Sequence, residues 1–202
     1  MWARGREDAP VRVRVERPEG WKVATQLVPT ADSAVFTAPN LQYLMDSPTD
    51  FSNFTLREFT VDDGRKRSGP PPTFRIALTH DGTEAEADAF ARDVEKIVRE
   101  SIPIFGELPD FETNTYTFLS VYLPWANGDG MEHRNSTILT STGSLANPQG
   151  VLGTMSHEFF HIWNVKRMRP AELGPFDYSR ERIGCSLGCS QLLVGGIRGG
   201  HG

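Results

Sequence analysis

The feature that most constrains this chain is the pentapeptide HEFFH at residues 157–161. Two histidines four positions apart project from the same face of a helix, because one helical turn takes about 3.6 residues. From that face the imidazole nitrogens of His157 and His161 can reach one metal ion, for which zinc is the usual choice in this motif. Glu158 is placed to polarise water rather than to bind the metal. The pattern therefore predicts a helix with a metal site.

The neighbouring residues indicate that one side of this helix is buried. Apolar side chains recur at helical spacing across residues 150–163 and form a stripe nearly opposite the two histidines: Leu152, Met155, Phe159, Ile162 and Trp163. Such a helix packs one side into a core and turns the other side towards a cleft. The alternative is an amphipathic helix whose two histidines are surface residues without a ligand.

Length and charge limit the classes of protein to which the chain can belong. At 202 residues it has room for one large domain or two small ones. A net charge of −5 without a basic stripe argues against a nucleic-acid partner. No apolar run approaches the roughly 18 residues that a membrane-spanning helix needs. The first eight residues lack the apolar segment of a signal peptide, and the sequence leaves the compartment and the oligomeric state open.

Roughly the first seventy residues are typical of β-structure. Strict alternation of apolar and polar residues at 11–15 and 54–61 predicts half-buried strands, and shorter candidates lie at 21–25 and 34–37. One helical turn is expected at 41–45. Short strands separated by turn signals predict a β-sandwich-like domain over residues 1–72. The basic and proline-rich segment 65–72 is the best candidate for a linker at its end.

The residues beyond this segment mix strands and helices. Strands are predicted at 74–78, 116–123 and 135–140, the second of them central, and a loop at 127–130. Thr83 and Glu86 form a capping box that begins an amphipathic helix. The helix is predicted to end near Ser101, because Pro103 cannot continue the hydrogen-bond ladder.

Three segments together resemble a known family. They are residues 157–170, the run Gly130–Thr137 and, more loosely, Asp46–Pro48. The chain resembles the glycyl aminopeptidase family of zinc metallopeptidases, within the thermolysin-like gluzincins, most strongly from about residue 70 to Glu181. The resemblance implies an α+β chain with a β-rich N-terminal domain and an incomplete thermolysin-like catalytic domain over residues 73–181. Since family members carry earlier strands and a PDZ domain, the chain is expected to be a piece of a longer protein.

The resemblance also implies what the metal helix does. His157 and His161 are expected to bind Zn²⁺ through neutral imidazoles. Glu158 is expected to act as the general base towards the attacking water and then to pass the proton to the leaving amine. These roles amount to zinc-dependent hydrolysis of a peptide bond, with a peptide as the substrate.

The segment before the metal helix supplies the substrate site implied by the resemblance. Glu132 matches the glutamate that binds the free α-ammonium of the substrate in related aminopeptidases, and Gly130 and Met131 are its neighbours in that site. An aminopeptidase acting on small N-terminal residues such as glycine is the activity that follows. A surface loop carboxylate remains the alternative for Glu132, and a structural role remains equally open for His133.

The C-terminal tail departs from the family pattern. A catalytic zinc of this class takes a third protein ligand, which the family carries as the glutamate of a Trp-x-x-Glu-Gly motif. The corresponding place here is near Gln191, and the glycine-rich residues 182–202 contain no carboxylate. Glu181, 20 residues beyond the second histidine, is one substitute, and the thiols of Cys185 and Cys189 are another. A truncated or shifted reading frame is the leading explanation, and it leaves the activity of this chain open.

Three functions therefore stay open for the chain. The first is a zinc aminopeptidase of the glycyl type. The second is a thermolysin-like endopeptidase, in which Glu132 plays no part in amine recognition. The third is a truncated, non-catalytic product that keeps only a peptide-binding or partner-binding β domain.

Overall fold

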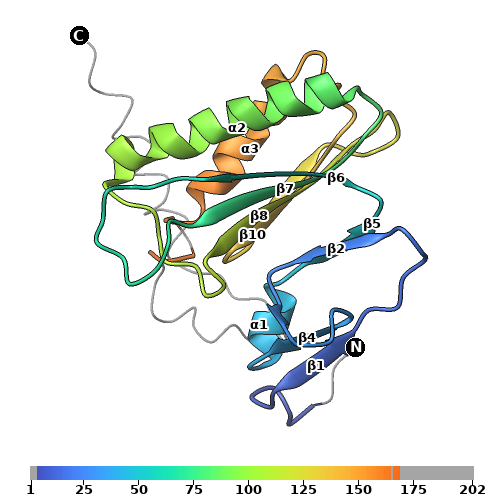
Figure 1. Cartoon of the computed structure of the whole chain (residues 1–202), viewed down its shortest axis with the longest axis vertical. Coiled ribbons are helices and arrows are strands. Elements are labelled where there is room, and N and C mark those ends of the chain that lie inside the picture. The colour runs from blue at the N-terminus through green and yellow to red at the C-terminus, as the bar shows by residue number, and fades with distance from the viewer. Residues whose placement is uncertain (1–3, 165, 169–202) are drawn as a thin grey trace.

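The computed structural model describes residues 4–164 and 166–168. Its N-terminal part contains five short strands and one short helix: β1 (Val11–Arg14), β2 (Lys22–Thr25), β3 (Val28–Pro29), β4 (Val35–Ala38), α1 (Leu41–Met45) and β5 (Thr49–Ser52). The remainder contains a larger sheet and two helices: β6 (Thr55–Thr60), β7 (Thr73–His80), α2 (Glu84–Phe105), β8 (Thr115–Tyr122), β9 (Asp129–Glu132), β10 (Ser136–Ser141) and α3 (Gln149–Phe160). The chain is thus of the α+β class, and Figure 1 shows the two helices and the N-terminal part on opposite faces of the larger sheet.

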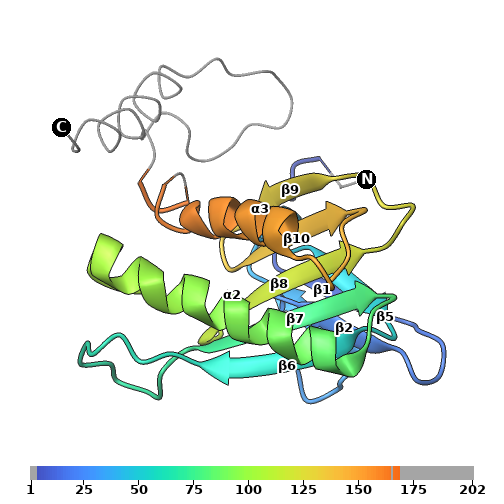
Figure 2. The same cartoon turned by 90° about the horizontal axis from the view of Figure 1, so that it is seen from above.

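The larger sheet has the strand order β6-β7-β8-β10-β9. Its three inner strands run parallel to one another, whereas β6 and β9 are antiparallel to their neighbours at the two edges. β8 lies in the middle, as its β-branched and aromatic residues predicted, and nearly all of its side chains are buried. Within the described residues β9 pairs with β10 alone, and α3 lies over the face of these two strands, as Figure 2 shows. The segment expected to be a loop at 127–130 therefore contributes two residues to an edge strand.

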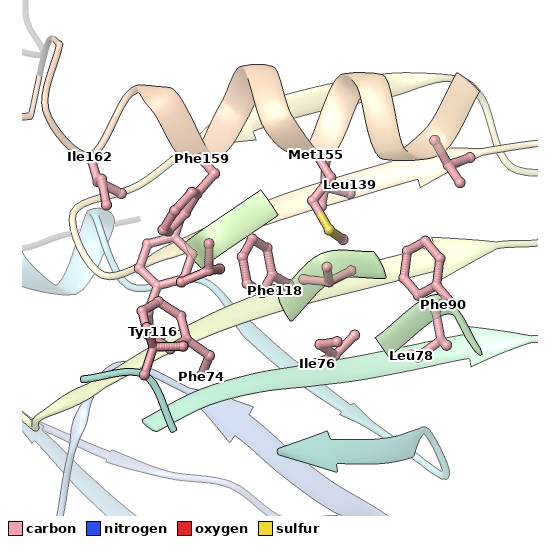
Figure 3. Close-up of a cluster of buried hydrophobic side chains, with 14 of the residues drawn as sticks. Phe74, Ile76, Leu78, Phe90, Tyr116, Phe118, Leu139, Met155, Phe159 and Ile162 are labelled. Atoms are coloured by element: carbon pink, nitrogen blue, oxygen red, sulfur yellow. The ribbon is translucent and has the colours of Figure 1, made fainter. Parts of the chain in front are cut away.

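The main core lies between this sheet and the two helices. Aromatic side chains of the sheet, among them Phe74, Tyr116 and Phe118, pack against Phe159 of α3 (Figure 3). The apolar stripe of the metal helix is buried as predicted, with Met155 and Phe159 at most 1 % exposed. Burial of one such side chain contributes roughly 1.5–3 kcal/mol. The core therefore fixes the rotation of α3, which sends its other face outwards.

The second helix begins as predicted but ends later. The side chain of Thr83 accepts a hydrogen bond from the Glu86 amide, and the Glu86 carboxylate accepts one from the Thr83 amide, which completes the capping box. The predicted end at Ser101 is wrong, because α2 continues through Pro103 to Phe105. A proline in the last turn removes only one hydrogen bond. Packing of Phe105 on Trp163, with ring centroids 4.2 Å apart, favours the extra turn.

The N-terminal part packs on the opposite face of the larger sheet. Two small sheets, β1-β4-β3 and β2-β5, agree with the predicted β-rich character of this region. Ala24 and Phe54 bury themselves against Ala77 and Leu119 of the larger sheet. Gln26, which is almost fully buried, donates a hydrogen bond to the Thr117 hydroxyl over 2.8 Å. This contact anchors the N-terminal part to the central strand β8.

The proline-rich segment 65–72 belongs to the connection between β6 and β7, which are neighbours in one sheet. Arg65 and Arg67 bind the buried carboxylate of Asp63 and also reach Asp110. The Val61 amide donates a hydrogen bond to the Pro72 carbonyl, so ion pairs and a backbone hydrogen bond both hold this connection. The linker at this segment and the domain boundary at residue 72 remain predictions, although β6 precedes the segment and joins the larger sheet.

No helix in the described part of the chain has the length and apolar character needed to cross a membrane.

Candidate metal and substrate site

The two motif histidines lie at the C-terminal end of α3. His157 occupies the last turn of the helix and His161 follows directly after it, at the C-cap. Their Nε2 atoms are 3.2 Å apart. Two histidine nitrogens bound to one tetrahedral zinc at about 2.0–2.1 Å stand roughly 3.3–3.4 Å from each other. The spacing in this structure therefore fits a shared zinc ion with little movement of either ring.

The turn after the helix orients one of these rings. His161 Nδ1 lies 2.8 Å from the backbone oxygen of Asn164, to which it donates a hydrogen bond when the proton is on Nδ1. The Nε2 lone pair is then free to bind a metal, and a carbonyl partner of this kind fixes the tautomer of a metal-binding histidine. No short sequence pattern points to Asn164, because the contact depends on how the chain turns beyond Phe160.

The glutamate between the histidines is buried against the edge strand. The side chain of Glu158 is only about one-tenth exposed and lies directly over Gly130 of β9. A Cβ atom on residue 130 would stand 2.5 Å from Glu158 Oε1 and 2.7 Å from its Cγ. Only glycine therefore leaves room for the Glu158 side chain in its observed position. The sequence suggested Gly130 as a substrate-binding residue and gave no sign of this steric role.

The environment of Glu158 raises the proton affinity of its carboxylate. Burial raises the pKa of the Glu158 carboxyl above its ordinary value, the nearby imidazoles of His157 and His161 oppose this rise, and the negative charge of Glu132 adds to it. A carboxylate with a raised pKa is a better proton acceptor than an exposed one. The burial that lets Glu158 pack on β9 therefore also suits it to receive and release a proton.

Glu132 reaches the same site from the end of β9. One ligand atom each of Glu132, Glu158 and His161 lie within 4.8 Å of one another. Glu132 and Gly130 share one side of the strand, as alternate residues do. Met131 lies between them and is 52 % exposed. Of the three residues suggested for substrate binding, the fold brings Glu132 beside His161 and Gly130 under Glu158, and it leaves Met131 facing solvent.

His133 turns away from the histidines. Its Nδ1 atom lies 3.2 Å from Asp46 Oδ1, and its Nε2 atom is buried without a hydrogen-bond partner. Asp46 also binds Lys166, with 3.1 Å between the carboxylate oxygen and Nζ. Asp46 comes from the N-terminal part, and the sequence alone did not predict that it lies next to the site.

The donor set suits zinc, as judged from the described residues alone. Two imidazoles with suitably spaced Nε2 atoms and two neighbouring carboxylates are ligands that zinc accepts. The candidates for a third protein ligand, Glu181, Cys185 and Cys189, lie outside the described residues, as does Gln191. The described residues thus bring together two candidate metal ligands, a candidate base and a candidate amine-binding carboxylate.

Comparison with known proteins finds similarity to one family at both ends of the described chain. Residues 1–53 match the family model described as the Peptidase M61 N-terminal domain, and residues 150–187 match the one described as M61 glycyl aminopeptidase. The chain is also similar to a solved structure, the crystal structure of the aminopeptidase N family protein from Idiomarina loihiensis. The two share 27 % sequence identity and superpose with a TM-score of 0.71 over 88 % of this chain. The present chain spans only 31 % of that protein. No curated protein matches the sequence.

Proposed function

We propose that this chain bears the metal-binding and amine-binding parts of a zinc aminopeptidase. Its matches to the M61 glycyl aminopeptidase family, over the N-terminal domain and part of the catalytic domain, support the proposal. The observation that supports the proposal most is the 3.2 Å spacing of the His157 and His161 Nε2 atoms, with the Glu132 carboxylate within 4.8 Å of a ring nitrogen of His161. Two metal ligands beside a carboxylate suited to an ammonium group are what removal of an N-terminal residue requires.

Each residue then has a chemical task. His157 and His161 would hold zinc, whose positive charge would serve to polarise the scissile carbonyl. Glu158 takes a proton from the attacking water and delivers it to the amine that leaves. The contact with Gly130 fixes the direction of the Glu158 carboxylate. Its raised pKa makes this carboxylate a better proton acceptor.

Glu132 decides between an aminopeptidase and an endopeptidase in this proposal. An ammonium group at the start of a peptide needs a negative partner, and a carboxylate on the edge strand beside the metal is suitably placed for one. A peptide that continued past this point would leave the Glu132 charge without a counter-charge in a partly buried site. The family description supports a small N-terminal residue such as glycine as the preferred substrate.

The third protein ligand of the zinc belongs to the part of the family's catalytic domain that follows α3. Glu181 is the candidate offered by its spacing of 20 residues from His161. Its participation is part of the proposal.

The test compares a glycyl peptide with a free amino terminus and the same peptide acetylated at that terminus, after the chain has been loaded with zinc. Cleavage of the free peptide at least about tenfold faster supports the aminopeptidase, because an ion pair of this kind is worth roughly 1–2 kcal/mol. Equal cleavage of both peptides indicates an endopeptidase. Absence of bound zinc together with absence of cleavage favours the non-catalytic product.

A substitution sharpens the comparison. Glu132→Gln should remove most of the preference for the free peptide and leave the zinc content unchanged. Glu95→Gln is the matched control, since Glu95 pairs with Arg99 on the exposed side of α2 and has no part in the site. A preference that survives Glu132→Gln would contradict the role proposed for Glu132.

A further inference from the structure

One carboxylate of the N-terminal part contacts both segments that form the site. Asp46 stands at the C-cap of α1, and its Oδ1 atom lies 3.2 Å from His133 Nδ1 and 3.1 Å from Lys166 Nζ. These partners are 87 and 120 residues away along the chain. No local pattern requires such contacts, which arise only because the tertiary fold brings three distant segments together.

The two partners adjoin the proposed functional residues. His133 directly follows Glu132, and its amide donates a hydrogen bond to the Ser136 carbonyl over 2.9 Å, which closes the turn between β9 and β10. The amide of Lys166 donates to the carbonyl of His161 over 3.2 Å. Asp46 thus binds a residue next to the amine-binding carboxylate and a residue bonded to the backbone of the second histidine.

Asp46 is itself fixed relative to the central sheet. The Asn40 side chain caps α1 by accepting a hydrogen bond from the Tyr43 amide. The Tyr43 hydroxyl donates to the Gln26 carbonyl over 3.0 Å, and the Gln26 side chain donates to Thr117 of β8. This series of contacts ties α1 to the strand at the centre of the sheet, so the Asp46 carboxylate offers a fixed point of attachment.

The charge on Asp46 suits both contacts. Burial raises the pKa of the Asp46 carboxyl, but the hydrogen bond with His133 and the charge of Lys166 outweigh it, so that the pKa lies below its ordinary value. A partly buried carboxylate with two donors binds more strongly than an exposed surface pair. A cavity of about 200 Å³ adjoins Asp46 and is lined also by Tyr43, Glu112 and Arg134. Water rather than a neighbouring side chain would therefore fill the place of a lost carboxylate.

We propose that Asp46 is a positioning residue through which the N-terminal part sets the separation between the end of β9, which bears Glu132, and the turn that follows His161. The proposal rests on the functions proposed above for Glu132 and His161. It assigns to the N-terminal part a task in the site itself. Asp46 acts there beside two other links between the same segments, which are the contact of Glu158 with Gly130 and the hydrogen bond from Arg167 to the Arg134 carbonyl.

The experiment measures the zinc dissociation constant by competition with a chelator, in the full chain and in three variants. Asp46→Ala removes both contacts and should raise the constant by up to about tenfold, the low end of what residues behind a metal ligand contribute. Asp46→Asn keeps an acceptor for His133 and should have an intermediate effect. Asp32→Ala is the control, because Asp32 pairs with Arg14 on the exposed surface of the same N-terminal part and should leave the constant unchanged.

A double variant separates positioning from general loss of stability. Lys166→Met alone should weaken zinc binding, and adding it to Asp46→Ala should cause little further loss, because both changes break the same contact. Additive effects would contradict the proposal. For the glycyl peptide, Asp46→Ala should raise KM more than it lowers kcat, since displacement of Glu132 affects amine binding first.

Hydrogen exchange tests the same idea without zinc or substrate. Asp46→Ala should speed amide exchange in residues 130–136 and 160–168 and leave β7 and β8 unchanged. Unchanged exchange in both segments would overturn the positioning role. A chain that neither binds zinc nor cleaves peptides would contradict the proposed function, and the exchange data would still decide whether Asp46 fixes these two segments.

Discussion

The Nε2 atoms of His157 and His161 lie 3.2 Å apart at the end of α3, with their ring planes nearly perpendicular. The spacing follows from one helical turn, but the fixed orientation does not. The Asn164 carbonyl accepts from His161 Nδ1, and the burial of Phe159 sets the rotation of the helix. Local geometry thus brings the two nitrogens together, and the core with the following turn aims them outwards.

Removal of either histidine should abolish tight zinc binding. We expect His161→Ala to raise the zinc dissociation constant by more than about 100-fold, because residues that only support a ligand already contribute 10–100-fold. His80→Ala should have no effect, since its ring contacts Thr55 on the opposite edge of the sheet. Metal analysis after dialysis measures the zinc content of the original chain, His161→Ala and His80→Ala. An equal zinc content in these three proteins would rule out the motif as the metal site.

Glu158→Gln should separate metal binding from catalysis. The amide is the same size and fits over Gly130, but it cannot accept a proton from water. Loss of a general base costs typically 10²–10⁴-fold in rate, so kcat should fall by about that much while bound zinc stays the same. Rates on the free glycyl peptide, measured beside the zinc content, give the answer. A variant that retained more than about a tenth of the activity would assign the base to another group.

Gly130→Ala should impair catalysis without removing the metal. The new Cβ would meet Glu158 Cγ and Cδ at 2.7 Å, so the glutamate must move by a sizeable fraction of an ångström. Misplacement of a catalytic group by about 1 Å can cost about 100-fold, and a loss of 10–100-fold in kcat is expected. Gly128→Ala is the matched control from the same segment, because a Cβ there meets no atom within 4 Å. Equal activity of the two variants would contradict the steric role of Gly130.

Asp63 makes the stability of the chain depend on pH in acid. Burial alone raises its pKa, but hydrogen bonds from Arg67 and from the Leu108 and Arg65 amides lower the pKa to about 2 from its ordinary value of 3.8. A carboxyl whose pKa is lower in the folded state stabilises that state when ionised. Its contribution is therefore present above pH 3.8 and is lost as the pH falls through about 2.

Denaturant titrations of Asp63→Asn should show this directly. Near neutral pH the variant should lose on the order of 1 kcal/mol of unfolding free energy, allowing for screening by solvent. The difference from the original chain should shrink between pH 4 and pH 2, because the carboxyl of the original chain then becomes neutral. Asp62→Asn serves as the control, since Asp62 is exposed and binds only the Gly64 amide. If the difference in unfolding free energy stayed constant with pH, the ionised carboxylate of Asp63 would not be its cause.

Several elements could be predicted from short stretches of sequence. The alternating residues of β1 and β6, the capping box of α2 and the apolar stripe of α3 each encode their structure within one or two turns of chain. The same locality explains one error. Pro103 suggested a helix end near Ser101, although packing of Phe105 on Trp163 favours the further turn.

By itself the sequence determined the metal helix, the pair of histidines and the glutamate between them, because residues four apart on a helix meet whatever surrounds them. Only the tertiary structure decided that Gly130 lies under Glu158, that Glu132 approaches His161, and that Asp46 contacts the segments next to both. Those relationships depend on an edge strand paired with β10 and on the N-terminal part docked across the sheet. Contacts between segments tens of residues apart arise from packing of the whole chain, and no local spacing encodes them.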